Sequence, residues 1–152
     1  MPVPKAEVLD LMRMEADPAE VDAIRELWKE HSKAEDARSI EGLLATLTDD
    51  CVYTVYPDDV SWHGHEGAAR FYTELLTAFP DVVFELQNIV IGPQGVVEEA
   101  IVTGTHSAKW LDNEPTGERM TWRNAIFFPW DPDARLFRGE RVYTDMPRRT
   151  AG

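Results

Sequence analysis

The period of the hydrophobic pattern changes once along this chain, near residue 80. Before that point apolar residues recur every three or four positions, and after it they recur at every second position. The apolar run between residues 64 and 79 predicts a helix that Pro80 ends. Segments 82–91 and 96–106 alternate around the turn 92–95 and predict a hairpin. Helices followed by long strands are typical of an α+β fold.

Local signals place the remaining elements. A short helix is predicted over 5–14, a second after the Asp17 N-cap with Pro18 at its first position, and a third after Ser39. Strands are predicted over 51–56, 119–129 and 136–145, with a turn at Asp49-Asp50. We expect one domain, 1–152, with residues 1–17 as an N-terminal extension. Its helices pack on a strongly curved antiparallel sheet, which makes a cone with a pocket at its open end.

Composition limits the partners. The net charge of −13 and the pI of about 4.6 disfavour phosphate backbones and anionic lipid, so neither nucleic acid nor a membrane is expected as a partner. The single cysteine, Cys51, excludes an internal disulfide. The N-terminus lacks the apolar core of a signal peptide and no stretch is apolar enough to span a bilayer, which predicts a cytoplasmic protein.

The stretch Ser61-Trp62-His63-Gly64-His65-Glu66-Gly67 has three interpretations: a metal site, a helix start, or residues at the rim of the pocket. His63 and His65 have the spacing of a metal pair, with Glu66 as a third ligand. The same residues suit a helix start, where a glutamate favours the positive end of the dipole. We favour the helix start and predict no metal, because no carboxylate cluster nearby completes a ligand shell.

Two histidines are candidates for acid–base chemistry. His106 ends a predicted strand and shares a face with Gly104, which leaves room beside it. The alternative is a structural histidine at the pocket rim. His31 follows Trp28 by one helical turn on an apolar stripe. It is either a donor facing the cavity or a hydrogen-bonded core residue.

Other polar candidates come from the strands. Tyr53 is a candidate phenol donor, and Asp145 is expected to pair with an inward-pointing Arg123 or Arg141. The tryptophans are either pocket walls or core residues. The predicted pocket residues are Trp28, Val55, Trp62, His63, Trp110, Arg123 and Tyr143. The chain has no nucleophile elbow, P-loop or dinucleotide fingerprint, so no cofactor is expected.

An ordered series of motifs resembles the NTF2-like superfamily and, within it, the SnoaL-like polyketide cyclase branch. The motifs are DDCVYTVYP, HGHEGAARFYTELLTAFPD, VTGTH, PTGERM and GERVYTD. The resemblance implies a cone-shaped fold, a homodimer formed through the sheets, and cofactor-free chemistry on hydrophobic ligands. In the cyclases a pocket His and an Asp support an aldol ring closure. His106 matches that His, and residues 118–123 offer no inward carboxylate to match the Asp.

Two other branches provide comparisons. Ketosteroid isomerase-like members carry a basic Asp before a Pro on the first strand, where this chain has Tyr56, and their phenolic donor aligns with His31. Limonene epoxide hydrolase-like members use an Asp-Arg-Asp set, and here His106 and Gly104 occupy two of its positions. Tyr53 matches the tyrosine that positions water in that branch.

These observations predict a cofactor-independent enzyme of the cyclase or isomerase type that acts on a hydrophobic carbonyl compound. His106 is the expected acid–base group, His31 and Tyr53 are donors to a developing enolate, and Asp145 orients a partner. The alternatives are a non-catalytic small-molecule binding protein, an epoxide hydrolase-like activity, and an interaction domain that uses the sheet surface.

Overall fold

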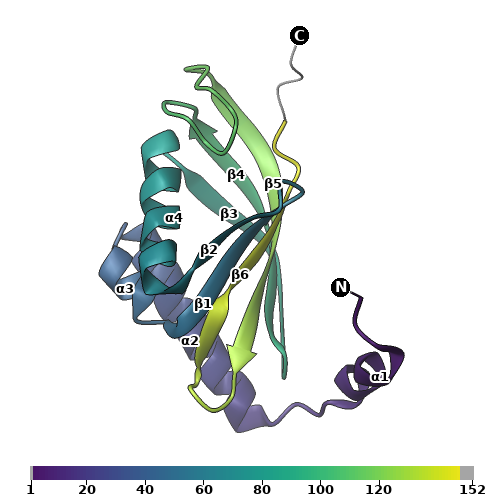
Figure 1. Cartoon of the computed structure of the whole chain (residues 1–152). Helices are drawn as coiled ribbons and strands as arrows, with labels where there is room; N and C mark the ends of the chain where they lie inside the picture. Colours follow the sequence, from purple (N-terminus) through teal and green to yellow (C-terminus); the bar gives the residue numbers. More distant parts are fainter. Residues whose placement is uncertain (1, 148–152) are drawn as a thin grey trace.

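The computed structural model describes residues 2–147, so residue 1 and residues 148–152 of the predicted domain lie outside it. In this range four helices and six strands follow one another in the order α1 (Lys5–Arg13), α2 (Pro18–Asp36), α3 (Ile40–Leu44), β1 (Leu47–Tyr56), β2 (Val60–His63), α4 (Gly64–Ala78), β3 (Val83–Gly92), β4 (Gly95–Thr105), β5 (Arg119–Asp131) and β6 (Leu136–Thr144). The strands form one curved sheet in the order β2-β1-β6-β5-β4-β3 (Figure 1). The predicted α+β cone is therefore confirmed.

Side-chain caps set the starts of the helices on the inner side of the sheet. Asp17 accepts a hydrogen bond from the Ala19 amide at 2.9 Å, and Pro18 occupies the first helical turn of α2. Ser39 caps α3 by accepting from the Gly42 amide at 3.0 Å. Both starts were predicted, because a capping oxygen satisfies amides that lack a helical partner.

One strand pair in the sheet is parallel. β1 and β6 run in the same direction, whereas the other four neighbouring pairs are antiparallel. The β1–β6 register shifts between Leu47 and Val52, and this irregularity contains Asp49 and Asp50. The prediction that these two residues form a turn was wrong, because they lie inside a continuous, bulged strand.

Strand alternation divides the sheet into an inner and an outer face. On β5 the buried positions are Trp122, Asn124, Ile126, Phe128 and Trp130, and on β6 the buried residues Glu140 and Val142 lie on either side of the exposed Arg141. Helices α2, α3 and α4 lie on the inner side (Figure 1), and α4 packs on β1. The core and any cavity therefore lie between these helices and the inner face.

The SWHGHEG stretch joins a strand to a helix. Its first residues belong to the edge strand β2, which was not predicted and pairs antiparallel with β1. Helix α4 begins at Gly64, as predicted, with His63 at its N-cap position. Gly67 packs against the Trp62 backbone, where a Cβ atom would stand 2.9 Å from the carbonyl carbon.

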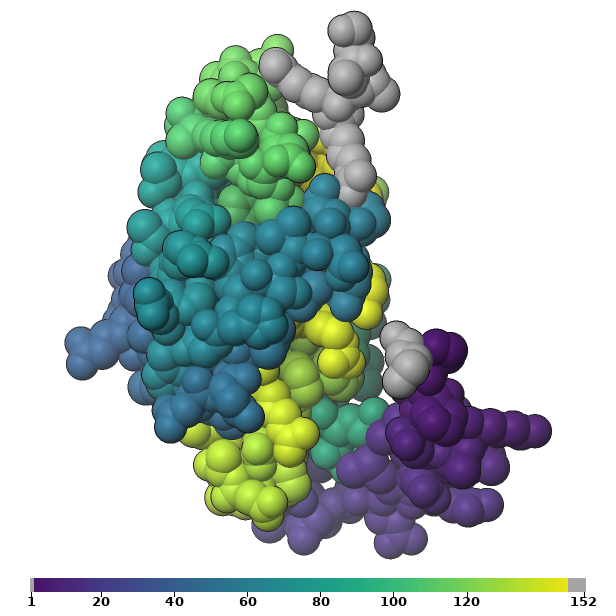
Figure 2. Space-filling model, viewed as in Figure 1, coloured from purple at the N-terminus to yellow at the C-terminus, as the bar shows by residue number. Residues whose placement is uncertain are grey.

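The outer face and α1 present apolar side chains to the surface. Val83, Val90, Val97 and Tyr143 are exposed, and α1 has no buried residue. Figure 2 shows α1 as a lobe that projects from the body of the molecule. The homodimer stays a prediction. Among residues 2–147, no helix combines the length and the hydropathy that crossing a bilayer requires.

The bulge opposite β1 depends on one glycine. Gly139 has a φ of +116°, and a Cβ atom there would overlap the Val52 carbonyl. We expect Gly139→Ala to lower the free energy of unfolding by about 3 kcal/mol, measured by urea denaturation. Gly92→Ala is the matched control, since no atom lies within 4 Å of its added Cβ. Equal stability of the two variants would contradict this account of the bulge.

Candidate active site

A small cavity of about 40 Å³ opens between the inner face of the sheet, α4 and the C-terminal end of α2. This volume holds roughly three water molecules. The lining residues are Glu35, Val55, Phe71, Leu75, Phe84, Trp110, Trp122, Asn124, Ile126, Glu140, Val142, Thr144 and Met146. None of them is Lys, Arg or His.

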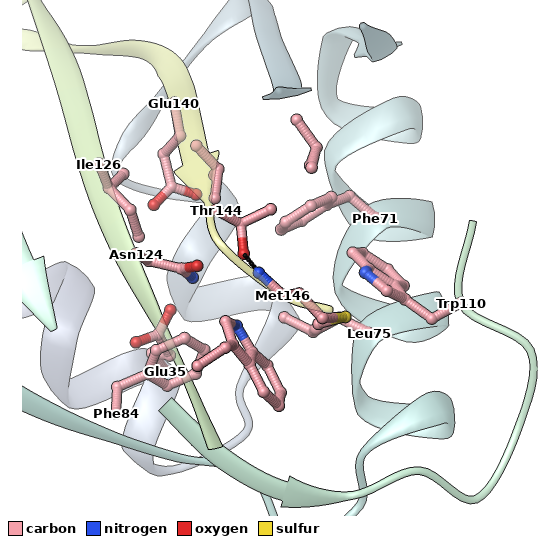
Figure 3. Close-up of a pocket in the computed structure, with 13 residues that line it drawn as sticks. Glu35, Phe71, Leu75, Phe84, Trp110, Asn124, Ile126, Glu140, Thr144 and Met146 are labelled. Carbon is pink, nitrogen blue, oxygen red and sulfur yellow. Dashed lines mark hydrogen bonds between the residues drawn. The ribbon is translucent and has the colours of Figure 1, made fainter. Parts of the chain in front are cut away.

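The lining is divided into a polar and an apolar side. Figure 3 shows Glu140, Asn124 and Glu35 along one side, with Phe71, Leu75 and Trp110 opposite them. The polar groups come from β6, β5 and α2, and the apolar groups come from α4 and the loop after β4. A ligand that fits this cavity has a polar end toward the sheet and an apolar body toward α4.

Glu140 is the most deeply buried acid of the site, with 3% of its surface exposed. Burial raises its pKa well above the usual value, and the nearby carboxyl groups of Glu35 and Glu98 raise it further. Both causes favour the neutral form of Glu140.

Two more acids share this environment. Glu35 is partly exposed at the cavity, and burial together with the charge of Glu98 raises its pKa to about 8. Burial raises the pKa of Glu98 to about 7, opposed by a hydrogen bond from Trp28 Nε1 at 3.1 Å. Glu35 on α2 and Glu98 on β4 thus titrate near neutral pH, and the two carboxyl groups are coupled.

A chain of hydrogen bonds lies behind Glu140. The Tyr72 hydroxyl lies 3.0 Å from Glu140 Oε2, 2.8 Å from the Tyr53 hydroxyl and 3.1 Å from His31 Nε2. The other ring nitrogen of His31 lies 2.7 Å from Thr46 Oγ1. Burial lowers the pKa of His31 to about 3, so the ring is neutral and carries one N–H.

The protonation state of Glu140 affects which atoms of this chain donate, because each hydroxyl group has only one hydrogen. Tyr72 has one hydrogen to donate, and it goes to Glu140 or His31 when the Tyr53 hydroxyl donates to Tyr72. When Glu140 is neutral and donates to Tyr72, Tyr72 donates to His31 Nε2, and the ring holds its hydrogen on Nδ1. When Glu140 is ionised, Tyr72 donates to the carboxylate, His31 carries its hydrogen on Nε2, and the Thr46 hydroxyl must turn its hydrogen from the Leu43 carbonyl, 2.7 Å away, to His31 Nδ1. The donor and acceptor roles along the whole chain therefore depend on whether Glu140 carries its proton.

Asn124 contributes an unsatisfied acceptor. Its side chain is 9% exposed, lines the cavity, and its Oδ1 atom has no hydrogen-bond partner in the protein. Leaving a buried amide oxygen unpaired costs about 1–3 kcal/mol. In Figure 3 its side chain points into the cavity between Glu140 and Glu35.

The structure brings two predicted donors together. His31 and Tyr53 are 2% and 0% exposed, and both bond to Tyr72. Neither lines the cavity, and both reach it only through Tyr72 and Glu140. The sequence left His31 as either a cavity donor or a hydrogen-bonded core residue, and in the structure it is buried and hydrogen-bonded behind the cavity wall.

His106 lies beside the cavity and not in it. Its ring stacks on Phe79 with a centroid distance of 5.0 Å, and its Nε2 atom is buried without a partner. It lines a separate hollow of about 30 Å³ that shares Met146 with the main cavity. The inner-face orientation of His106, with Gly104, agrees with strand alternation.

The other predicted residues fall into three groups. Val55 and Trp110 line the cavity, and Trp62 stacks on Trp110 with the ring planes 10° apart. Trp28 bonds to Glu98, and His63 is exposed before α4. Asp145, Arg123 and Tyr143 line a shallow hollow on the outer face. There the Asp145 carboxylate accepts from the Arg123 amide at 2.5 Å and joins the ends of β5 and β6.

The acids of the cavity were missed at the sequence level, although two signals pointed to them. Glu35 continues the helical stripe of Trp28 and His31 at the next turn. Glu140 alternates with Val142, so an inward Val142 places Glu140 inward as well. Asn124 alternates with Trp122 in the same way.

With this geometry in place, comparison with known proteins identifies the family. The model of the SnoaL-like domain matches residues 28–138, and the chain belongs to this family. No curated protein matches the chain in sequence.

Solved structures share the fold at low identity. A candidate SnoaL-like polyketide cyclase from Jannaschia sp. CCS1 is 21% identical with a TM-score of 0.69, over 88% of this chain and 90% of its own. An NTF2-like protein of unknown function from Burkholderia pseudomallei is 15% identical with a TM-score of 0.68, over 81% and 91%. AclR from Streptomyces galilaeus, a candidate hydroxylase, is 19% identical with a TM-score of 0.65, over 82% and 90%. Because these neighbours carry different activities in their names, the reaction must be argued from the site.

The tautomer of His31 reports the proton on Glu140. At pH 7 we expect a neutral ring with its hydrogen on Nδ1, detected by nitrogen-15 NMR of the imidazole. Glu140→Gln should keep this tautomer, because an amide also donates to Tyr72. A hydrogen on Nε2 in the wild type at pH 7 would mean that Glu140 is ionised.

Proposed function

We propose that this protein is a cofactor-independent acid–base enzyme that acts on a small hydrophobic carbonyl compound in the cavity. The observation that carries the proposal is the pair of carboxyl groups, Glu35 and Glu140, which face one apolar-walled space with raised pKa values. Perturbed acids in a cleft are typical of catalytic sites, since a proton exchanged near neutral pH needs a group that titrates there.

The two acids suit different steps. Glu35 has a pKa of about 8 and is partly exposed, so its ionised form is available to remove a proton next to a carbonyl. The raised pKa of Glu140 favours its neutral form, and when substrate binds, the single hydrogen of that form turns from Tyr72 to the carbonyl oxygen, where negative charge develops. As that proton moves toward the oxygen, Tyr72 turns its hydroxyl hydrogen to Glu140 Oε2, which lies 3.0 Å away.

This assignment moves the acid–base role from His106 to the carboxyl groups. His106 lies in the neighbouring hollow, and Asp145 lies on the outer face of the sheet. His31 and Tyr53 act as positioning residues through Tyr72. The products of enolate chemistry of this kind include isomers and ring-closed aldols, which fits the polyketide cyclases named among the structural neighbours.

Substrate size is limited by the cavity. Met146 and Thr144 separate its 40 Å³ from a larger hollow of about 340 Å³ that also contacts Trp110. Ligands of a few heavy atoms fit the cavity as it stands. A polycyclic compound requires Met146 to move and the two spaces to join.

The proposal predicts exchange of the protons next to a carbonyl in small ketones. Wild-type protein should speed deuterium incorporation into acetone or cyclopentanone in D₂O, followed by proton NMR. Glu35→Gln should lower the protein-dependent rate about 100-fold, which is the scale of general-base catalysis. The rate should rise with pH and level off above a pKa of about 8, because the ionised form of Glu35 is the base.

Two variants make this test specific. Glu30→Gln lies on the exposed side of the same helix and should keep the wild-type rate. His106→Ala should also keep most of it, and a loss there would return the acid–base role to His106. No exchange above buffer with either ketone would contradict the enzymatic proposal and favour the alternative of a binding protein with the same cavity.

A further inference from the structure

The polar lining of the cavity is acidic or neutral. The polar atoms of its lining belong to Glu35, Glu140, Asn124, Thr144 and the Trp side chains, and it contains no basic residue. Of these, Asn124 Oδ1 is buried and lacks any donor in the protein. A buried acceptor that is aimed into a cavity requires an N–H or O–H from whatever occupies the cavity.

A second acceptor set surrounds that oxygen. In Figure 3 the carboxyl groups of Glu140 and Glu35 flank Asn124 on the same side of the space. The cavity lining contains no cation to neutralise them, and the charge of Glu35 contributes to the raised pKa of Glu140. A cationic ligand would remove that repulsion and allow one of them to ionise.

The aromatic side chains of the cavity suit the alkyl part of an organic cation. Trp110, Trp122 and Phe71 line the cavity, and each is at most 4% exposed. Aromatic faces attract organic cations, and the attraction is stronger where water is excluded.

From these three features we propose that the cavity binds a small primary ammonium ion, with its N–H groups directed to Asn124 Oδ1 and the carboxyl groups of Glu35 and Glu140, and its alkyl part against the aromatic wall. The three hydrogens of an –NH₃⁺ group match three acceptors on one side of the space. This inference goes beyond the proposed function: it concerns ligand binding, rests on the same cavity and requires no catalysis.

Binding is coupled to a proton. Glu35 faces Glu98 on β4, Glu140 on β6, and Asp36 and Arg38 near its own helix end, and the acids outnumber the single cation. An ammonium ion pairs best with ionised Glu35, so binding releases a proton below pH 8. The affinity should therefore rise between pH 6.5 and 8.5, a range in which an alkylamine stays protonated.

The test compares isopropylammonium with isopropanol, a neutral molecule of the same shape, by isothermal titration calorimetry at pH 8.5. We expect isopropylammonium to bind at least tenfold more tightly. Titration at pH 7 in phosphate and in HEPES, which differ in their heats of ionisation, should show net proton release. Equal affinity for the two probes, or no binding of isopropylammonium, would overturn the proposal.

Matched variants separate the contacts. Asn124→Leu should weaken isopropylammonium at least tenfold without lowering the melting temperature, because it removes an unsatisfied buried oxygen. Glu35→Gln should weaken it and abolish the pH dependence, whereas the exposed Glu30→Gln should bind as wild type does. Unchanged affinity in a folded Asn124→Leu protein would contradict the assignment.

The outcomes of the two experiments are independent. Ammonium binding without ketone exchange would refute only the catalytic proposal. Ketone exchange without ammonium binding would refute only this inference. Tetramethylammonium adds a further distinction: it has charge but no N–H, so binding as tight as that of isopropylammonium would overturn the role of Asn124.

Discussion

The placement of three acidic side chains against the inner face of one sheet, two of them buried and one partly exposed, is the constraint on which the rest of this site depends. Glu35, Glu98 and Glu140 come from α2, β4 and β6, and no buried lysine or arginine accompanies them in the core of the described residues. Such groups are tolerated when they hold protons or share hydrogen bonds. The protein provides both, through raised pKa values and through the hydroxyls and indole N–H that contact the acids.

The same contacts join the elements of the cone. Tyr72 on α4 links His31 on α2, Tyr53 on β1 and Glu140 on β6. Around them, aromatic rings pack edge to face, as in the pair of Tyr53 and Tyr72 with centroids 5.4 Å apart. A polar network of this kind fixes the position of each member and transmits the state of one proton to the others. The residues that hold these helices and strands together are therefore the same ones that support the proposed acid–base chemistry.

The sequence predicted the architecture well, because periodicity and caps are local signals. The change of period near residue 80, the Asp17 and Ser39 caps and the hairpin at 92–95 all specify elements that the structure contains. It predicted the site less completely. The bulge at Gly139 and the pairing of β1 with β6 are long-range features, and they determine which residues of β6 meet Tyr72.

The inward carboxylate sought beside residues 118–123 is supplied by other elements instead, as Glu140 and Glu35. Strand alternation indicates which residues of a single strand face inward. It does not reveal that acids from α2, β4 and β6 lie close together in the folded chain. The pKa values depend on that meeting, because burial and neighbouring charge arise only in the folded chain.

The most direct test of the central claim is the pH dependence of stability between pH 7 and 8.5, measured by urea unfolding. An acid whose pKa is raised in the folded state stabilises the protein at low pH, and this stability is lost as pH rises toward the folded pKa. Each proton that the folded protein keeps and the unfolded chain has lost lowers the free energy of unfolding by about 1.4 kcal/mol for each unit of rising pH. The account predicts a fall in the wild type, a shallower fall in Glu140→Gln, and a wild-type slope in Glu85→Gln, which changes an exposed residue of β3. The same slope in wild type and Glu140→Gln would show that Glu140 is ionised in the folded protein and would contradict the account.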